Sequence, residues 1–216
     1  LNPYLDEVCQ RLSAGAGEDY AASRGEYLNG LLVADLLGFE FVDPADIVHF
    51  DAEGRFDAEK TQDSVSSRLA STTRAVVPGF YGALPDGSIK TFSRGGTDIS
   101  GAIVARATGS DVYENWTDVS GLLMADPRIV ENPRTIDVLT YRELRELAYM
   151  GATVLHDEAI FPVRQAGIPV HIRNTDTPDQ EGTIIIREMG KTPPSGQITG
   201  IAGRKDFTII ALEKTL

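Results

Sequence analysis

Short apolar segments rich in β-branched residues alternate with longer amphipathic segments along most of the chain. The short segments predict strands at 39–42, 74–77, 89–92, 112–116, 136–139, 168–172 and 183–187. The longer segments predict helices at about 5–12, 27–37, 60–69, 99–108, 140–151 and 157–166. Strands that alternate with helices in this way favour a three-layer α/β fold, with a largely parallel central sheet covered by helices on both faces.

The composition changes near the end of the chain. Glycine, proline and serine cluster over residues 188–197, and an apolar segment follows at 207–212. Such a cluster is typical of a linker, and the later segment is typical of a buried strand. We therefore expect one domain over 1–187, a linker over 188–197 and the start of a second domain over 198–216.

The charge and the cysteine content exclude several classes of function. The chain has 32 acidic and 20 basic residues, for a formal net charge of −12. Such a surface repels phosphate backbones and acidic lipids, so we expect neither a nucleic-acid nor a membrane partner. The single cysteine, Cys9, excludes an intrachain disulfide and fits a cytoplasmic protein. The three histidines have no ligand-like spacing, so no protein metal site is predicted.

The segment 90–98 carries the clearest chemical signal. Gly95 and Gly96 lie between Arg94 and the pair Thr97-Asp98, which lets the backbone approach a ligand closely. The following helix offers free N–H groups and a positive dipole end, and Arg94 can grip a carboxylate with two parallel hydrogen bonds. The alternative is structural: Thr97 or Asp98 caps the helix, and the glycines form a turn.

Two further segments have polar residues where a ligand can bind. Residues 23–26, Ser-Arg-Gly-Glu, have the spacing of a capping box, which alone explains them; Glu26 at a helix start can instead bind an ammonium group. Residues 115–121 and 126–128 follow a predicted strand. Because ligands of open parallel sheets lie beyond the carboxyl ends of strands, these residues are candidates for a nucleotide pocket.

Taken together, these segments resemble aspartate kinase, of the amino-acid kinase superfamily. The matching motifs are Ser23-Arg24-Gly25-Glu26, Gly79-Phe80, Arg94-Gly95-Gly96-Thr97-Asp98, Trp116-Thr117-Asp118-Val119, Asp126-Pro127-Arg128, Gly151, Val154-Leu155-His156, Arg173-Asn174-Thr175 and Gly182-Thr183. Each motif is short, but their order and spacing extend over residues 20–187. Acetylglutamate, glutamate and uridylate kinases share the sheet of this superfamily without this set of motifs.

The resemblance implies a reaction and its substrates. It implies transfer of the γ-phosphoryl group of ATP to the side-chain carboxylate of L-aspartate, the first step towards lysine, threonine and methionine. Mg²⁺ would be held mainly through the phosphates, without a dedicated protein cage. The whole protein would be a homo-oligomer.

The same resemblance implies a role for each motif residue. Glu26 would hold the substrate ammonium, and Phe80, Arg94 and Thr97 would surround its carboxylates. Asp98 would orient the phosphate-binding lysine and organise the reaction centre. The nucleotide pocket would be lined by Thr117, Asp118, Arg128 and the backbone near Val154.

The sequence departs from the family pattern at four places. The family's opening Lys-Phe-Gly-Gly segment does not occur in these 216 residues. Thr153, Leu123 and Asp157 stand where lysine, tyrosine and proline are common. We expect a partial kinase domain over 1–187 with little turnover by itself, followed by the start of an ACT-like regulatory domain. The alternatives are a non-catalytic nucleotide-binding or assembly module and a kinase for another small carboxylate.

Overall fold

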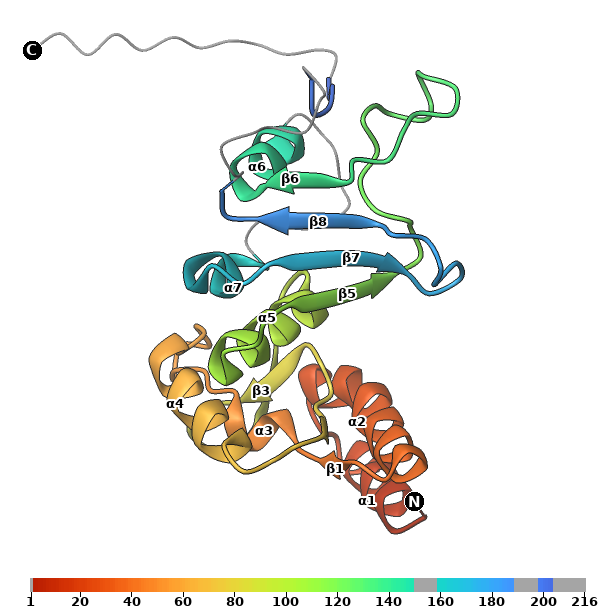
Figure 1. Ribbon diagram of the computed structural model, residues 1–216. Helices are drawn as coiled ribbons and strands as arrows, with labels where there is room; N and C mark the ends of the chain where they lie inside the picture. The colour runs from red at the N-terminus through yellow and green to blue at the C-terminus, as the bar shows by residue number, and fades with distance from the viewer. Residues whose placement is uncertain (1, 150–158, 189–197, 204–216) are drawn as a thin grey trace, which may run out of the picture. The chain divides into compact units, whose positions relative to one another are not determined.

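The computed structural model describes residues 2–149, 159–188 and 198–203, which belong to two compact units (Figure 1). The first unit holds Leu1–Asn115 and Leu155–His171, and the second holds Trp116–Val154 and Ile172–Leu216. Helices and strands alternate along the chain, so the predicted α/β class is confirmed.

The described elements follow in chain order. They are α1 Asn2–Ser13, α2 Glu18–Leu37, β1 Glu40–Phe41, α3 Pro44–Ile47, α4 Ala58–Leu69, β2 Ala75–Val76, β3 Tyr81–Ala83, β4 Ile89–Thr91, α5 Gly96–Thr108, β5 Tyr113–Thr117, β6 Val138–Thr140, α6 Tyr141–Tyr149, α7 Phe161–Ala166, β7 Val170–Asn174 and β8 Thr183–Ile186. No described helix is both long and apolar enough to cross a bilayer.

The first unit is built on a parallel pair, β1 with β2, in which Glu40 lies opposite Ala75. Its core gathers buried side chains from the segment after β1, from α4 and from α5: Val42, Ile47, Val48, Phe50, Val65, Leu69 and Ile103. Phe92 packs its ring 5.0 Å from that of Phe50. Full burial of each large apolar side chain stabilises the fold by about 1.5–3 kcal/mol, so this core anchors α5.

A hairpin that the sequence did not predict joins β3 to β4. The strands are antiparallel, with Tyr81 opposite Thr91 and Gly82 opposite Lys90. A Cβ atom on Gly82 would overlap the carbonyl oxygen of Val48, so only glycine allows this approach. The hairpin returns the chain to its start, where the N–H of Phe92 donates to the carbonyl of Phe80 at 2.9 Å.

Helix α2 begins earlier than predicted. It starts at Glu18, not at Tyr27, so residues 23–26 lie in its interior and the capping-box interpretation is wrong. Ser23 is fully buried, and its hydroxyl donates to the carbonyl of Tyr20 at 2.8 Å. The predicted end is confirmed: Gly38 closes the helix in the left-handed conformation, with φ at 65°.

The second unit contains a parallel pair, β6 with β8, with Leu139 opposite Ile185. The strand order of the sheet is β5-β7-β8-β6. The predicted capping box at the start of α6 is confirmed. Glu143 Oε2 accepts from the N–H of Thr140 at 2.7 Å, and Thr140 Oγ1 accepts from the N–H of Glu143 at 3.2 Å.

Several predictions fall partly or wholly outside the described residues. They concern residues 189–197 of the predicted linker, the predicted strand at 207–212 and the first residues of the helix predicted at 157–166. The described part of that helix is α7, Phe161–Ala166.

Candidate active site

Phe80, which packs on the start of α5, has an unusual backbone conformation. Phe80 has φ at 63°, in the left-handed region that a bulky residue enters at a cost of about 1–2 kcal/mol. Its N–H donates to Ser100 Oγ at 2.9 Å, and the Ser100 hydroxyl donates to the carbonyl of Gly96 at 2.7 Å. Together with the bond from Phe92, these contacts fix the Phe80 backbone against the first turns of α5.

The two glycines have different structural roles. Gly95 is the N-cap of α5, with φ at 55° and no side-chain cap hydrogen bond, so the alternative in which Thr97 or Asp98 is the cap is wrong. A Cβ atom on Gly96 would lie 2.5 Å from Phe80 Cβ and 2.9 Å from Phe80 Cα. Because these are atoms at or next to the backbone, neither can move aside. The glycine pair therefore lets the Phe80 segment lie directly on the start of α5.

The start of α5 presents positive charge and free donors to a ligand. Arg94 is exposed immediately before the helix, and its guanidinium makes no hydrogen bond or ion pair with any described residue. Thr97 is also exposed. The first N–H groups of the helix lack intrahelical acceptors, and the helix dipole favours an anion there. Arg94 and Thr97 thus lie exposed at the helix start on which the Phe80 backbone packs, and these groups suit a carboxylate.

Asp98 lies in the first turn of α5 and is held from β5. Asn115 Nδ2 donates to Asp98 Oδ1 at 2.9 Å, and the Tyr113 hydroxyl donates to the carbonyl of Asp98 at 3.2 Å. Burial raises the pKa of Tyr113 to about 12, and the nearby charge of Asp98 acts in the same direction. The phenol therefore stays neutral and serves as a donor. The sequence did not single out Tyr113 or Asn115 for this contact.

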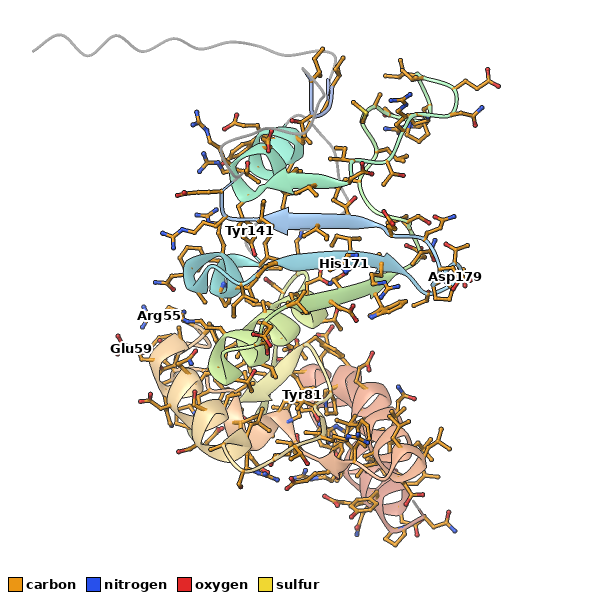
Figure 2. The ribbon with its side chains drawn as sticks, in the orientation of Figure 1. Arg55, Glu59, Tyr81, Tyr141, His171 and Asp179 are labelled. Carbon is orange, nitrogen blue, oxygen red and sulfur yellow. The ribbon has the colours of Figure 1, made fainter. Side chains whose placement is uncertain are left out.

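Residues 23–26 divide into structural and free side chains. Arg24 is 7% exposed and lies over the rings of Tyr20 and Tyr27, each 4.5 Å from its guanidinium carbon. A third ring, that of Tyr81 on β3, lies 5.3 Å away. Tyr81 is labelled in Figure 2. These cation–π contacts fix α2 on the hairpin. Glu26 is half-buried and makes no hydrogen bond or ion pair with any described residue, including Arg94 and Asp98.

In the second unit, Thr117 and Asp118 lie at the carboxyl end of β5. The carbonyl of Thr117 accepts from the N–H of Thr175 at 2.9 Å, and the Thr117 hydroxyl donates to Asp118 Oδ1 at 3.2 Å. Trp116 is 44% exposed, with the Arg173 guanidinium 4.5 Å above its ring. The end of β5 thus carries an open cluster of polar and aromatic groups.

Arg128 is bound within its own loop. Its Nη2 lies 2.6 Å from Asp126 Oδ2, and its Nε also donates to that carboxylate. These hydrogen bonds lower the pKa of Asp126 and raise that of Arg128. Arg128 makes no hydrogen bond or ion pair with Thr117 or Asp118 in the part of the chain that the structure describes. Val154 and the neighbouring Gly151, Thr153, His156 and Asp157 lie outside that part, whereas Leu123 pairs with Thr135 in an isolated bridge.

Metal-binding side chains do not gather among the described residues, where no group of three or more His, Cys, Asp or Glu could hold an ion. His49 instead lies with its Nε2 2.8 Å from Ser64 Oγ, and burial, its largest influence, lowers its pKa.

The α/β fold, with a glycine pair and a candidate anion site at the start of α5, agrees with the family that the sequence matches. Residues 2–174 match the amino acid kinase family, and the chain belongs to that family. Within it, the chain is similar to aspartokinases. It is 39% identical to aspartokinase 3 of Bacillus subtilis in an alignment of 206 positions, which covers 92% of this chain and 45% of that protein.

Solved structures give the same result. The chain is 54% identical to the aspartate kinase of Clostridium acetobutylicum, with a TM-score of 0.87 over 93% of this chain and 46% of that one. It is 26% identical to Escherichia coli aspartokinase III, solved with aspartate and ADP, with a TM-score of 0.75 over 88% of this chain and 46% of that one. The chain thus spans less than half the length of these relatives.

Proposed function

We propose that the protein containing this chain is an aspartate kinase, which transfers the γ-phosphoryl group of ATP to the side-chain carboxylate of L-aspartate. The product is 4-phospho-L-aspartate, at the first step towards lysine, threonine and methionine. The observation that carries this proposal is the similarity to an aspartate kinase at 54% identity over 93% of the chain. The exposed, cationic start of α5 supports it, because the substrate is an acidic amino acid.

In this proposal the first unit supplies the aspartate contacts. Arg94, the Thr97 hydroxyl and the backbone at Phe80 hold the carboxylates, and Glu26 holds the ammonium. Charge complementarity supports these roles: Arg94 and Glu26 have no ion-pair partner among the described residues, so each is available to a ligand of opposite charge. The strained but well-bonded Phe80 backbone keeps its part of the site rigid before substrate binds.

The reaction needs positioning more than it needs a strong base. The acceptor carboxylate is already an anion at neutral pH, so catalysis depends on in-line placement and on stabilising the charge of the transferring phosphoryl group. Asp98 orients the phosphate-binding lysine and helps to organise the reaction centre. Bound Mg²⁺ would supply further positive charge around the phosphates. The nucleotide pocket is lined by Thr117, Asp118, Arg128 and the backbone of Val154.

The remaining parts of the proposal concern the organisation of the whole protein. Residues 1–187 form part of the kinase domain, 188–197 are a linker and 198–216 begin an ACT-like regulatory domain. The protein is a cytoplasmic homo-oligomer. We expect residues 1–216 alone to have little turnover, because they do not contain the lysine of the family's Lys-Phe-Gly-Gly segment.

The direct test is a kinase assay on a full-length version, extended to the span of its aspartokinase relatives. Hydroxylamine trapping should detect phosphorylated aspartate, with glutamate and acetylglutamate as much poorer acceptors. Equal use of another acceptor would favour a kinase for a different small carboxylate. Tight ATP binding without any turnover would favour a non-catalytic nucleotide-binding module.

Arg94→Ala tests the carboxylate contact. Loss of a bidentate, charge-assisted pair should raise the KM for aspartate by about 30-fold or more and leave the Kd for ATP within about twofold. Arg106→Ala is the matched control, because Arg106 is at the far end of α5 and donates to Gln165. Equal loss of aspartate and ATP binding in Arg94→Ala would refute the assigned role.

A further inference from the structure

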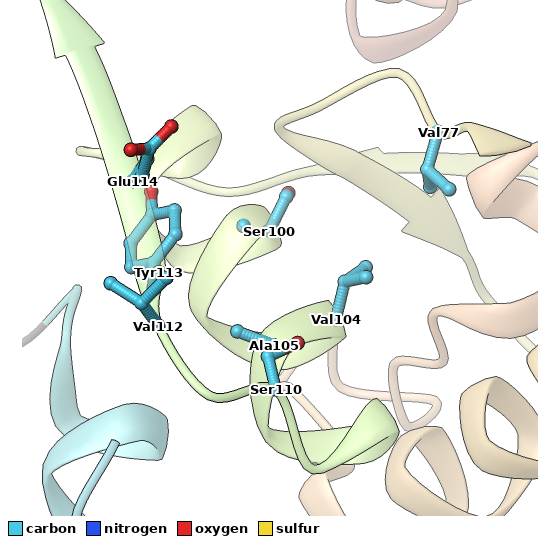
Figure 3. A pocket seen from close by; sticks show the side chains of 9 residues that line it. Val77, Ser100, Val104, Ala105, Ser110, Val112, Tyr113 and Glu114 are labelled. Carbon is cyan, nitrogen blue, oxygen red and sulfur yellow. The ribbon is translucent and has the colours of Figure 1, made fainter. Parts of the chain in front are cut away.

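Strand β5 presents alternate side chains to α5. Tyr113 and Asn115 are partly buried, whereas Glu114 between them is exposed. Figure 3 shows the Tyr113 ring on β5 beside the turn of α5 that carries Ser100. Both residues line a cavity of about 260 Å³. One face of this strand is therefore directed at the helix whose first turn contains Asp98.

Helix α5 is shaped to receive that strand face. Gly101 lies one turn after Asp98, and a Cβ atom there would lie 2.6 Å from the Tyr113 hydroxyl. With glycine at this position, the phenol reaches past the helix surface to the carbonyl of Asp98, 3.2 Å away. The phenol oxygen in turn accepts from Asn115 Nδ2 at 3.0 Å, which fixes the orientation of the amide.

The Asn115 amide occupies only one oxygen of the carboxylate. Nδ2 donates to Asp98 Oδ1 at 2.9 Å, and Oδ2 accepts no hydrogen bond from any described residue. An amide donor stabilises the charged form of a carboxylate and selects one of its rotamers. The pair Tyr113–Asn115 thus leaves a single oxygen of Asp98, in a defined direction, for other partners.

We propose that Asn115 is a positioning residue of the kinase, which holds the Asp98 carboxylate through Oδ1 so that Oδ2 is directed at the reacting groups. Tyr113 supports it by bridging the Asn115 amide and the Asp98 backbone. This inference rests on the proposed function, in which Asp98 organises the reaction centre. Asn115 itself contacts neither substrate in this role.

The test compares variants of the full-length kinase at saturating and limiting aspartate. Asn115→Leu keeps the approximate shape and removes the donor, and Asn115→Asp replaces the donor by a second carboxylate. A misdirected Asp98 should lower kcat by about 10- to 100-fold, with the larger loss in Asn115→Asp, while the KM for aspartate and the Kd for ATP change less than about threefold. Glu114→Gln, on the other face of the same strand, should retain wild-type kcat.

A spectroscopic measurement tests the contact without depending on turnover. Relative to the wild-type protein, the NMR signals of the Asn115 side-chain NH₂ group should shift in Asp98→Asn and should not shift in Glu114→Gln. Unchanged signals, or an Asn115→Leu enzyme with the kcat of Glu114→Gln, would overturn the inference. If the wild-type protein lacks aspartate kinase activity but the Asn115 signals shift in Asp98→Asn, the proposed function and the positioning role of Asn115 are refuted and only the contact remains.

Discussion

Replacing Thr183 with valine tests whether a motif shared with aspartate kinases serves the fold or the reaction. Thr183 is fully buried at the start of β8. Its hydroxyl accepts from the N–H of Leu122 at 2.8 Å and donates to the carbonyl of Ile136 at 2.7 Å. Leu122 and Ile136 are themselves buried, so water cannot replace the hydroxyl.

Thr183→Val preserves the shape of the side chain and removes both hydrogen bonds. A buried polar group left without a partner costs about 1–3 kcal/mol, and two such groups are created. Allowing for partial relaxation, we expect the free energy of unfolding to fall by about 2–4 kcal/mol. The KM for aspartate and for ATP should not change, because the residue acts within the fold.

The assay is urea unfolding followed by circular dichroism, with Thr183→Ser as the matched control. Serine keeps the hydroxyl and loses one methyl group, which should cost only about 1 kcal/mol. If the valine variant is as stable as the serine variant, the two hydrogen bonds do not stabilise the fold as argued. A raised KM in a valine variant of normal stability would place Thr183 in the active site instead.

Two further predictions concern α2. Gly25→Ala should raise the free energy of unfolding by about 0.8–1 kcal/mol, because the position is helical and a Cβ atom there meets nothing within 4 Å. Thermal unfolding measures this gain in stability, and weakened aspartate binding would show that the ligand comes close to Gly25. Burial raises the pKa of Asp19, but hydrogen bonds from Thr91 and Lys90 outweigh burial and hold that pKa below 3.8. Asp19 therefore stabilises the fold at higher pH and loses this effect as pH falls through its folded pKa. The stability difference between wild type and Asp19→Asn should shrink in acid, and a constant difference from pH 6 to pH 2 would contradict this prediction.

Local signals in the sequence predicted much of the fold. The strands at β1, β2 and β4–β8 were predicted to within a few residues, because each lies in a short segment of apolar, aromatic or β-branched residues between turn or helix signals. The start of α6 was predicted because Thr140 and Glu143 satisfy each other's backbone within one turn. Such signals need no knowledge of distant contacts, so they survive in the sequence alone.

Elements that depend on distant contacts were not predicted. The spacing of Ser23 and Glu26 imitates a capping box, but Arg24 is buried under Tyr81, which is remote in the chain, and this packing requires a continuous α2. Strand β3 contains Gly82, a residue that disfavours strands, because the strand passes directly over Val48. In the candidate site, Asn115 was predicted only as part of a nucleotide pocket, and its contact with Asp98 was missed, although its spacing of two from Tyr113 on one strand indicates a shared face.

The motifs shared with aspartate kinases combine two kinds of residue. In residues 94–97 the glycines allow the Phe80 segment to lie on α5, and this packing leaves Arg94 and Thr97 exposed at the helix start. In residues 23–26, Ser23 and Arg24 are buried, and Glu26 makes no hydrogen bond or ion pair with another residue that the structure describes. A charged group is most available to a ligand when the fold fixes its position without satisfying its charge. The structural residues of each motif fix the position, and the partnerless side chain beside them is the one whose substitution should change substrate binding most.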